Sequence, residues 1–140
     1  DAKVEPVSQP PNRLVLRGNT ASKIVSAMIR VTQPGGTARK AALSGHSVAG
    51  KTGTSQKLVD GSYRGHGKYI ASFIGFAPAS DPAFVLLVIA DSPSTGTYYG
   101  GTVAAPTFSR IAEQTLRYLA VPPDLADQIA VNDTRRWQHP

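Results

Sequence analysis

Apolar side chains recur at helical spacing in two parts of the chain. A first helix is predicted after Thr20 or Ser22, either of which is a candidate N-cap, from these apolar residues: Ile24, Val25, Met28, Ile29 and Val31. Pro34, followed by two glycines, predicts the end of that helix. A last helix is predicted to stop at Pro122, and we expect its buried face to consist of Phe108, Ile111, Leu116 and Leu119.

Three segments between these helices have the composition of β-strands. Residues 47–55 contain glycine, residues 69–76 are aromatic and apolar, and residues 84–91 are almost continuously apolar. Turn-forming residues separate the strands at 60–62 and at 78–82. Because the second connection is too short for a crossover helix, we predict that the last two strands are antiparallel.

This order of elements predicts an α/β fold of the α+β type, in which helices flank an antiparallel sheet. A further short helix is predicted at 38–42. We expect a connecting segment at residues 1–13, a folded body at 14–123 and a loose tail at 124–140.

Composition narrows the classes of function. Of the 140 residues 41% are hydrophobic, enough for a core, and the formal charge of +6 favours anionic partners. The longest apolar run, residues 83–90, is too short to cross a bilayer. There is no cysteine, and the three histidines show no metal-binding spacing, so we expect neither a metal nor a cofactor.

The segment at 45–54 has the densest chemistry and supports three interpretations. A phosphate-binding loop, G-x-x-x-x-G-K-[ST], fits from Gly45 to Thr52, but it needs a buried strand before it and a helix that begins at the lysine. A nucleophile elbow, G-x-S-x-G, fits around Ser47 only in part, because Ala49 stands where the second glycine is needed. The third interpretation is an edge strand that carries Lys-Thr-Gly.

In an extended strand Lys51 and Gly53 point to one face, and Thr52 and Thr54 point to the other. A twist, or a bulge at Gly53, would bring both pairs to one cleft. Gly53 has no Cβ that would keep an extended peptide away from the strand edge. A lysine with hydroxyl donors suits a carboxylate ligand.

Further blocks arrive in order around that strand. They are GGTA at 35–38, VAGKTGTSQK at 48–57, YIASFIGFAP at 69–78 and YYGGTVAAPTF at 98–108. Together they closely resemble the C-terminal part of the transpeptidase domain of a class B penicillin-binding protein, the septal or elongation D,D-transpeptidase of bacterial cell-wall synthesis. The resemblance covers residues 14–123 and implies the fold shared by penicillin-binding proteins and serine β-lactamases.

The resemblance implies a role for each residue of the strand. Lys51 would be catalytic, because it would supply positive charge beside the nucleophilic serine and help proton transfer. Thr54 would also be catalytic, because its backbone N–H would be one of two oxyanion-hole donors. Thr52 and Thr54 would bind the terminal carboxylate of a D-Ala-D-Ala stem peptide or of a β-lactam, and Gly53 would belong to the same substrate-binding strand.

Two further motifs of the family are missing from the chain. The family requires S-x-x-K, which holds the acylated serine, and S-x-N, but none of the twelve serines here has Lys three residues later or Asn two residues later. Both motifs precede the Lys-Thr-Gly strand in the family. We therefore expect a C-terminal part that is inactive alone, with the serine in an upstream portion of the same transpeptidase. The alternatives are a non-catalytic binding or scaffold module of the same fold, or a P-loop nucleotide-binding protein.

The resemblance also implies partners and a location. Tyr98 and Tyr99 would lie beside the cleft and shape the acyl pocket. The partners would be the upstream portion, the stem peptide, β-lactam antibiotics and other cell-wall synthesis proteins, but not nucleic acid. The location would be the periplasmic face of the bacterial inner membrane, with the anchor outside this chain. We interpret Lys57, Arg64 and Lys68 as a solvated basic face, with binding to anionic wall or membrane components as the alternative. We interpret Asp91 as the end of a strand.

Overall fold

Three strands form one antiparallel sheet in the order β1–β2–β3. The computed structural model describes residues 13–63, 67–94 and 96–125. Strand β1 (Ala49–Gln56) pairs with β2 (Tyr69–Ala77), which pairs in turn with β3 (Phe84–Asp91). The predicted antiparallel meander is confirmed, and β1 begins slightly later than predicted.

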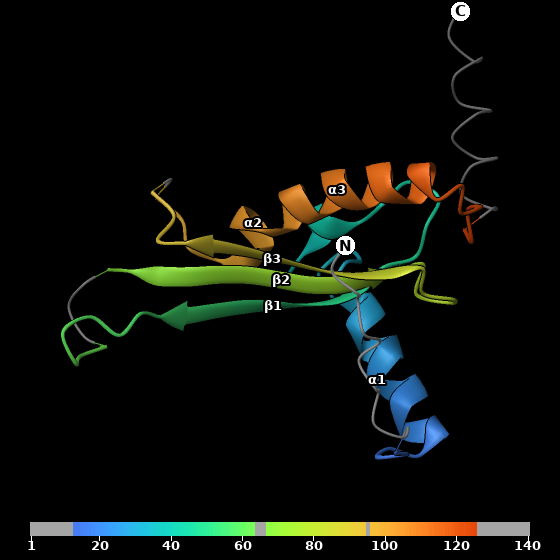
Figure 1. Ribbon diagram of the computed structural model, residues 1–140, viewed down its shortest axis with the longest axis horizontal. Helices are drawn as coiled ribbons and strands as arrows, with labels where there is room; N and C mark the ends of the chain where they lie inside the picture. Colours follow the sequence, from blue (N-terminus) through green and yellow to red (C-terminus); the bar gives the residue numbers. More distant parts are fainter. Residues whose placement is uncertain (1–12, 64–66, 95, 126–140) are drawn as a thin grey trace, which may run out of the picture.

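Helices lie on both sides of this sheet (Figure 1). Helices α2 (Gly100–Val103) and α3 (Ala105–Tyr118) lie over one face, which we call the covered face. Helix α1 (Gly18–Arg30) lies on the opposite side, the open face, and extends away from the sheet. A short 3₁₀ turn, η1 (Arg39–Ala41), forms where a short helix is predicted and packs against α3. The expected α+β architecture is therefore confirmed.

The core lies between the covered face and α3. Phe73 of β2 meets Phe108 of α3 edge to face, with ring centroids 4.8 Å apart, and both side chains are fully buried. Leu116 is buried about two turns further along α3. The rest of the core consists mainly of small residues, above all Ala105 and Ala112 of α3. These small side chains let the helix approach the sheet closely, as a densely packed core requires.

Two residues that we expect on the buried face of the last helix are exposed. Ile111 is 41% exposed and Leu119 is 48% exposed. Ala112, which follows Ile111, takes the buried position instead, because the face centred on Phe108 and Leu116 continues at a spacing of four residues. Leu119 lies beyond the last helical residue and serves only as its C-cap.

The predicted N-caps of the first helix are also wrong. Helix α1 begins at Gly18 with Arg17 as its N-cap, and no side chain caps it. The Ser22 hydroxyl donates to the Gly18 carbonyl oxygen at 3.0 Å, and the Thr20 hydroxyl approaches Asn19. Both hydroxyls lie inside the helix because it starts earlier than the apolar pattern indicates.

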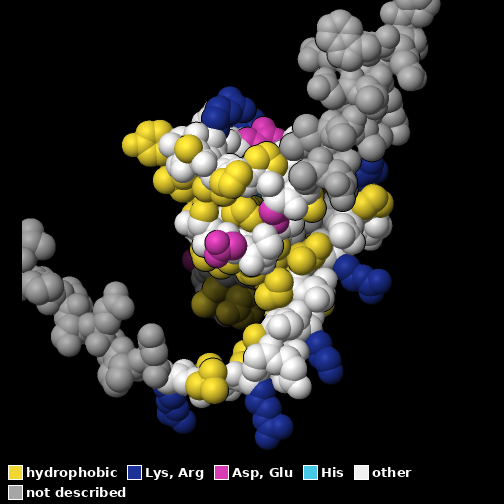
Figure 2. Space-filling view, turned by 90° about the vertical axis from the view of Figure 1, so that its right-hand side faces the viewer, with side chains coloured by type: hydrophobic (Ala, Val, Ile, Leu, Met, Phe, Trp, Pro, Cys, Tyr) yellow, Lys and Arg dark blue, Asp and Glu magenta, His cyan; other side chains and the backbone are white. Residues whose placement is uncertain are grey.

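The open face of the sheet carries a row of exposed apolar side chains, which are Ile74, Val85, Leu87 and Ile89. They alternate with half-buried residues of the covered face, as expected for strands with two different faces. Figure 2 shows Lys and Arg side chains standing separately along the edge of the molecule rather than gathered in one patch. Within the described ranges, no helix has the length and apolar character needed to cross a membrane.

The start of the predicted tail is attached to the body. The Asp124 carboxylate accepts hydrogen bonds from the Ser47 backbone N–H at 2.7 Å, from the Ser47 hydroxyl, and from the Ser80 hydroxyl at 2.6 Å. The Leu125 N–H donates to the Gly45 carbonyl oxygen at 3.1 Å. A loose tail is therefore wrong for residues 124 and 125, and residues 126–140 lie outside the described part of the chain.

Replacement of Asp124 by alanine is expected to lower the free energy of unfolding by about 1 kcal/mol at pH 7. The variant lacks the exposed carboxylate and therefore the charge-assisted hydrogen bonds that it accepts. Partial burial raises the pKa of Asp124, but the hydrogen bonds from Ser47 and Ser80 outweigh it and hold that pKa below its ordinary value. The contribution is therefore complete above the unfolded-state pKa and is lost as pH falls through the lower folded-state pKa.

Urea denaturation at pH 7 and at acid pH measures this effect, with Asp81→Ala as the matched control. Asp81 is exposed and follows Ser80 in the connection between β2 and β3, so its replacement is expected to change stability little. An equal loss for both variants, or a loss for Asp124→Ala that persists in acid, would contradict the assignment.

Candidate functional site

The Lys-Thr-Gly sequence lies in β1, the strand at one edge of the sheet. Lys51 pairs with Ile74, Thr52 with Phe73 and Gly53 with Ser72, one residue against one along the whole strand. The continuous register contradicts a bulge at Gly53. Among the described residues β1 has only β2 as a strand neighbour, so its other edge offers backbone groups for pairing with an extended ligand.

The side chain of Lys51 links the two faces at this edge. Thr52 lies on the covered face because its partner Phe73 does, whereas Lys51 starts from the open face. The Lys51 ammonium nevertheless donates to the Thr52 carbonyl oxygen at 2.9 Å and lies 3.5 Å from Thr52 Oγ1. Lysine length, rather than a bulge, thus brings the charge to the threonine side of the strand.

A hollow of about 340 Å³ opens on the covered side of β1. Its lining is rich in hydroxyl groups and glycines and contains no acidic side chain: Thr37, Thr52, Thr54, Tyr99, Gly100, Gly101 and Thr102. Thr37 Oγ1 and Thr52 Oγ1 are 3.3 Å apart, and the Gly100 N–H donates to Thr54 Oγ1 at 3.3 Å. Hydroxyl donors beside a lysine and away from carboxylates suit an anionic ligand.

The hollow exists because glycines let α2 approach the sheet closely. A Cβ on Gly100 would collide with the Ser72 carbonyl oxygen and lie 2.7 Å from the Gly53 carbonyl oxygen. A Cβ on Gly101 would collide with the Thr37 carbonyl oxygen. At Gly53 the missing Cβ leaves room for the Ser72 hydroxyl, which is a different reason from the ligand access that we predict from the sequence.

Three tyrosine rings adjoin one another beside the hollow, two of them stacked and the third, Tyr99, tilted by 37° to Tyr98; we call them the tyrosine stack. The rings of Tyr69 and Tyr98 are nearly parallel with centroids 3.9 Å apart, and the Tyr98 and Tyr99 centroids are 4.7 Å apart. The neighbouring Tyr99 phenol is the main cause that raises the pKa of Tyr98 above its ordinary value of 10.0, so the Tyr98 phenol stays neutral at pH 7. Tyr99 lines the hollow itself, whereas Tyr98 lines an adjoining one together with Tyr69.

The structure brings together most of the predicted site residues. Thr52, Thr54 and Tyr99 share the hollow, while Lys51 and Tyr98 lie next to members of its lining. Sequence reasoning missed Thr37 and the segment 100–102 as site residues. Their only sequence signal is membership of the blocks that carry the resemblance: Thr37 belongs to GGTA, and residues 100–102 belong to YYGGTVAAPTF. Both blocks include residues outside any predicted helix or strand.

The same geometry contradicts the other two interpretations of residues 45–54. Lys51 and Thr52 lie within a strand, so no helix N-terminus is available there for phosphate binding. Ser47 precedes a strand instead of lying on a strand-to-helix turn, and its hydroxyl holds Asp124 and the Ala79 N–H. In the described part of the chain, no group of three or more His, Cys, Asp or Glu residues is placed to hold a metal ion.

Comparison with known proteins gives consistent matches. Residues 4–113 match the family described as the penicillin binding protein transpeptidase domain. The chain is 40% identical over 129 residues to a protein of Neisseria flavescens named as a probable peptidoglycan D,D-transpeptidase PenA, covering 88% of this chain and 32% of that protein. It is 43% identical over 115 residues to the peptidoglycan D,D-transpeptidase FtsI of Escherichia coli K12, covering 81% of this chain and 19% of FtsI.

Solved structures agree with these matches. The TP domain of penicillin-binding protein 3 from Burkholderia pseudomallei superposes with a TM-score of 0.72 at 41% identity, covering 87% of this chain and 37% of that one. The transpeptidase domain of FtsI4 from Legionella pneumophila gives a TM-score of 0.56 at 35% identity, covering 71% and 36%. The chain thus spans a third or less of the two curated relatives described above.

Replacement of Gly101 by alanine is expected to lower the free energy of unfolding by about 1–3 kcal/mol, because the new methyl group collides with backbone and forces α2 away from Thr37. Gly18→Ala is the matched control. Nothing lies within 4 Å of a Cβ at Gly18, so a helical alanine there leaves stability unchanged or slightly raised. Chemical denaturation of both variants is the measurement, and equal stability for the two would disprove the close approach.

Proposed function

The chain belongs to the family of penicillin-binding protein transpeptidase domains, and on that premise we propose that it forms the Lys-Thr-Gly wall of a peptidoglycan D,D-transpeptidase. The observation that supports this most directly is the hollow on the covered side of β1. There the hydroxyls of Thr52 and Thr54 face a space without acidic groups, and the Lys51 ammonium lies at its edge.

We propose that this wall binds the terminal carboxylate of a D-Ala-D-Ala stem peptide or of a β-lactam. Thr52 and Thr54 donate hydrogen bonds to the carboxylate, and such charge-assisted bonds are stronger than neutral ones. Lys51 adds positive potential, and the extended ligand lies along the unpaired edge of β1 in the manner of an added strand. The net charge of +6 supports the binding of an anionic substrate.

We infer that the reaction is acyl transfer through a serine outside this chain. Attack forms a bond between the serine oxygen and the substrate carbonyl carbon. The amide or β-lactam C–N bond breaks, and the proton of the serine hydroxyl passes to the leaving nitrogen. Lys51 assists that proton transfer by its positive charge. The Thr54 N–H is proposed as one of the oxyanion-hole donors, a kind of group that is typically worth about 3–4 kcal/mol.

The tyrosine stack is proposed as the wall against which the acyl side chain lies. Tyr99 already lines the hollow, and Tyr98 extends the aromatic surface toward Tyr69. Flat rings offer apolar area with little side-chain entropy to lose. On this proposal the protein acts on the periplasmic side of the membrane, where its substrate is, with the upstream portion of the transpeptidase and other cell-wall synthesis proteins as partners.

In the protein that joins this chain to its upstream portion, a penicillin is expected to acylate a serine outside residues 1–140, and this chain alone is expected to stay unlabelled. Peptide mass spectrometry after labelling locates the adduct. A label within residues 1–140, at Ser47 first of all, would contradict the assignment of the motifs. A complete lack of labelling in the joined protein would favour the non-catalytic binding or scaffold module.

Lys51→Met is expected to lower the second-order rate constant of acylation by about 100-fold or more, because it removes the group that assists proton transfer. Thr52→Val is expected to lower it by about tenfold, since it removes one hydrogen bond to the carboxylate. Lys40→Met is the matched control: Lys40 is exposed on η1 and its loss leaves the rate unchanged. Intact-mass time courses give all three rates, and equal effects of Lys51→Met and Lys40→Met would reject the role of Lys51.

A further inference from the structure

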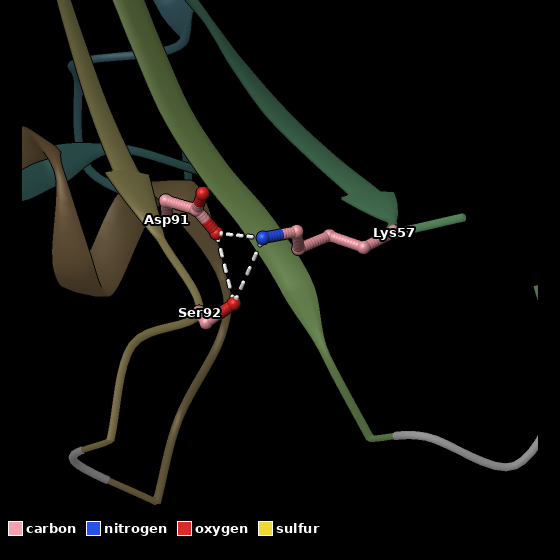
Figure 3. Close-up of polar contacts among 3 residues, drawn as sticks. All are labelled: Lys57, Asp91 and Ser92. Carbon is pink, nitrogen blue, oxygen red and sulfur yellow. Dashed lines mark hydrogen bonds and ion pairs between the residues drawn. The ribbon is translucent and has the colours of Figure 1, made fainter. Parts of the chain in front are cut away.

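A polar cluster of three residues closes one end of the sheet. Lys57 Nζ lies 2.6 Å from Asp91 Oδ1 and 3.3 Å from Ser92 Oγ, and the Ser92 hydroxyl donates to Asp91 Oδ1 at 2.8 Å. Lys57 follows β1, Asp91 ends β3, and Figure 3 shows the lysine side chain reaching across β2 between them. Lys57 is thus a partner in a specific ion pair and not simply part of a solvated basic face. Arg64 of that face lies outside the described residues.

Backbone bonds place this cluster at the start of the connection from β3 to α2. The Ser92 N–H donates to the Tyr69 carbonyl oxygen at 2.8 Å, and the Lys57 N–H donates to the Lys68 carbonyl oxygen at 3.0 Å. Ser92 has a φ of 50°, a left-handed conformation that costs a serine energy unless neighbouring contacts hold it. The hydrogen bonds of Ser92 to Lys57 and Asp91 supply such contacts at the residue where the chain turns.

The same connection is held on the opposite face of β2 as well. Asp91 pairs with Ile70 and lies on the open face, and alternation puts Lys57 there too. Tyr69 precedes Ile70 in β2 and therefore lies on the covered side, where its ring stacks on Tyr98. The connection is therefore tied to β2 by an ion pair on one face and by an aromatic stack on the other, and its far end is fixed where Gly100 donates to Thr54.

We propose that Lys57 and Asp91 are positioning residues, which hold Ser92 in its turn and so fix Tyr98 and Tyr99 at the edge of the hollow. This inference rests on the proposed function, because it assigns to the cluster the placement of the aromatic wall for the acyl side chain. The cluster touches neither the hydroxyl groups of the hollow nor Lys51. Its loss therefore affects recognition of the side chain and leaves acylation of a side-chain-free ligand intact.

The energetic scale distinguishes this role from a purely structural one. Asp91 is exposed and Lys57 is only partly buried, and an ion pair that solvent reaches in this way contributes little to global stability. The Lys57 hydrogen bond, followed by that of Ser92, lowers the pKa of Asp91, so the carboxylate is ionised at neutral pH. An effect on ligand selectivity without an effect on folding is therefore the expected signature.

The test uses Lys57→Met, Lys57→Arg and Asp91→Asn in the protein that carries this chain together with its upstream portion. Lys68→Met is the matched control. The positive charge of Lys68 also acts on the Asp91 carboxylate, but the side-chain hydrogen bond to Asp91 comes from Lys57 and not from Lys68. Intact-mass time courses give the acylation rate constants for benzylpenicillin, which has an aromatic side chain, and for 6-aminopenicillanic acid, which has none. Hydrogen exchange of residues 92–99 reports the anchoring independently of any reaction.

Lys57→Met and Asp91→Asn are expected to slow acylation by benzylpenicillin about tenfold, since small misplacements of binding groups have effects up to roughly 100-fold. The rate with 6-aminopenicillanic acid stays unchanged, Lys57→Arg restores most of the benzylpenicillin rate, and Lys68→Met behaves like the unaltered protein. Exchange in residues 92–99 becomes faster in Lys57→Met, while exchange in β2 does not.

Several results would overturn the inference. Equal slowing with both β-lactams, an equal effect of Lys68→Met, or unchanged exchange in residues 92–99 would each show that the cluster does not position the tyrosines. If the unaltered protein reacts with neither β-lactam, the proposed function fails. The exchange experiment then still decides whether Lys57 and Asp91 anchor the connection.

Discussion

The contact between Phe108 and Phe73 sets the position of the elements around the candidate site. Gly75, the next covered-face residue of β2, leaves room for it, because a Cβ there would lie 3.0 Å from the Phe108 ring. The contact holds α3 on the sheet, and α2 is joined to α3 through the single residue Ala104. Once α3 is in place, α2 has little freedom, because Gly100 meets the backbone of the sheet and Gly101 meets the backbone of Thr37. The hollow is thus a consequence of core packing.

Polar contacts at the two ends of the sheet complete this arrangement. At one end Asp124 joins the segment after α3 to Ser47 and Ser80. At the other end Lys57 and Asp91 join the first and last strands across the middle one. Both clusters are largely exposed, so each adds at most about 1 kcal/mol to the free energy of folding. Their effect is local, because each holds a connecting segment.

The electrostatic character of the site follows from which residues are near β1. Threonine hydroxyls and glycine backbone line the hollow, and the Lys51 ammonium lies at its edge. Among the residues that the structure describes, no carboxylate belongs to the lining. Such a surface suits a bound anion, and the only side-chain nucleophiles in the lining as described are hydroxyl groups. The proposed function accordingly gives substrate binding to this chain and nucleophilic attack to the upstream portion.

The sequence by itself determined the antiparallel meander and the presence of Lys51, Thr52 and Thr54 on an edge strand. Those features depend on alternation, on turn residues and on short connections, all of which act between near neighbours in the chain. It also carried the family resemblance, because whole blocks of residues matched in order. The exposed Ile111 was not predicted, because helical spacing does not show that alanines face the sheet.

Only the tertiary structure decided how the site is assembled. Thr37 meets Thr52, Tyr69 stacks on Tyr98, and Lys57 reaches Asp91 although 34 residues separate them in the chain. No periodicity links such pairs, since their distance depends on how strands and helices pack. Where Gly101 passes the backbone, sequence shows only that a glycine is present, and packing shows which contact requires it.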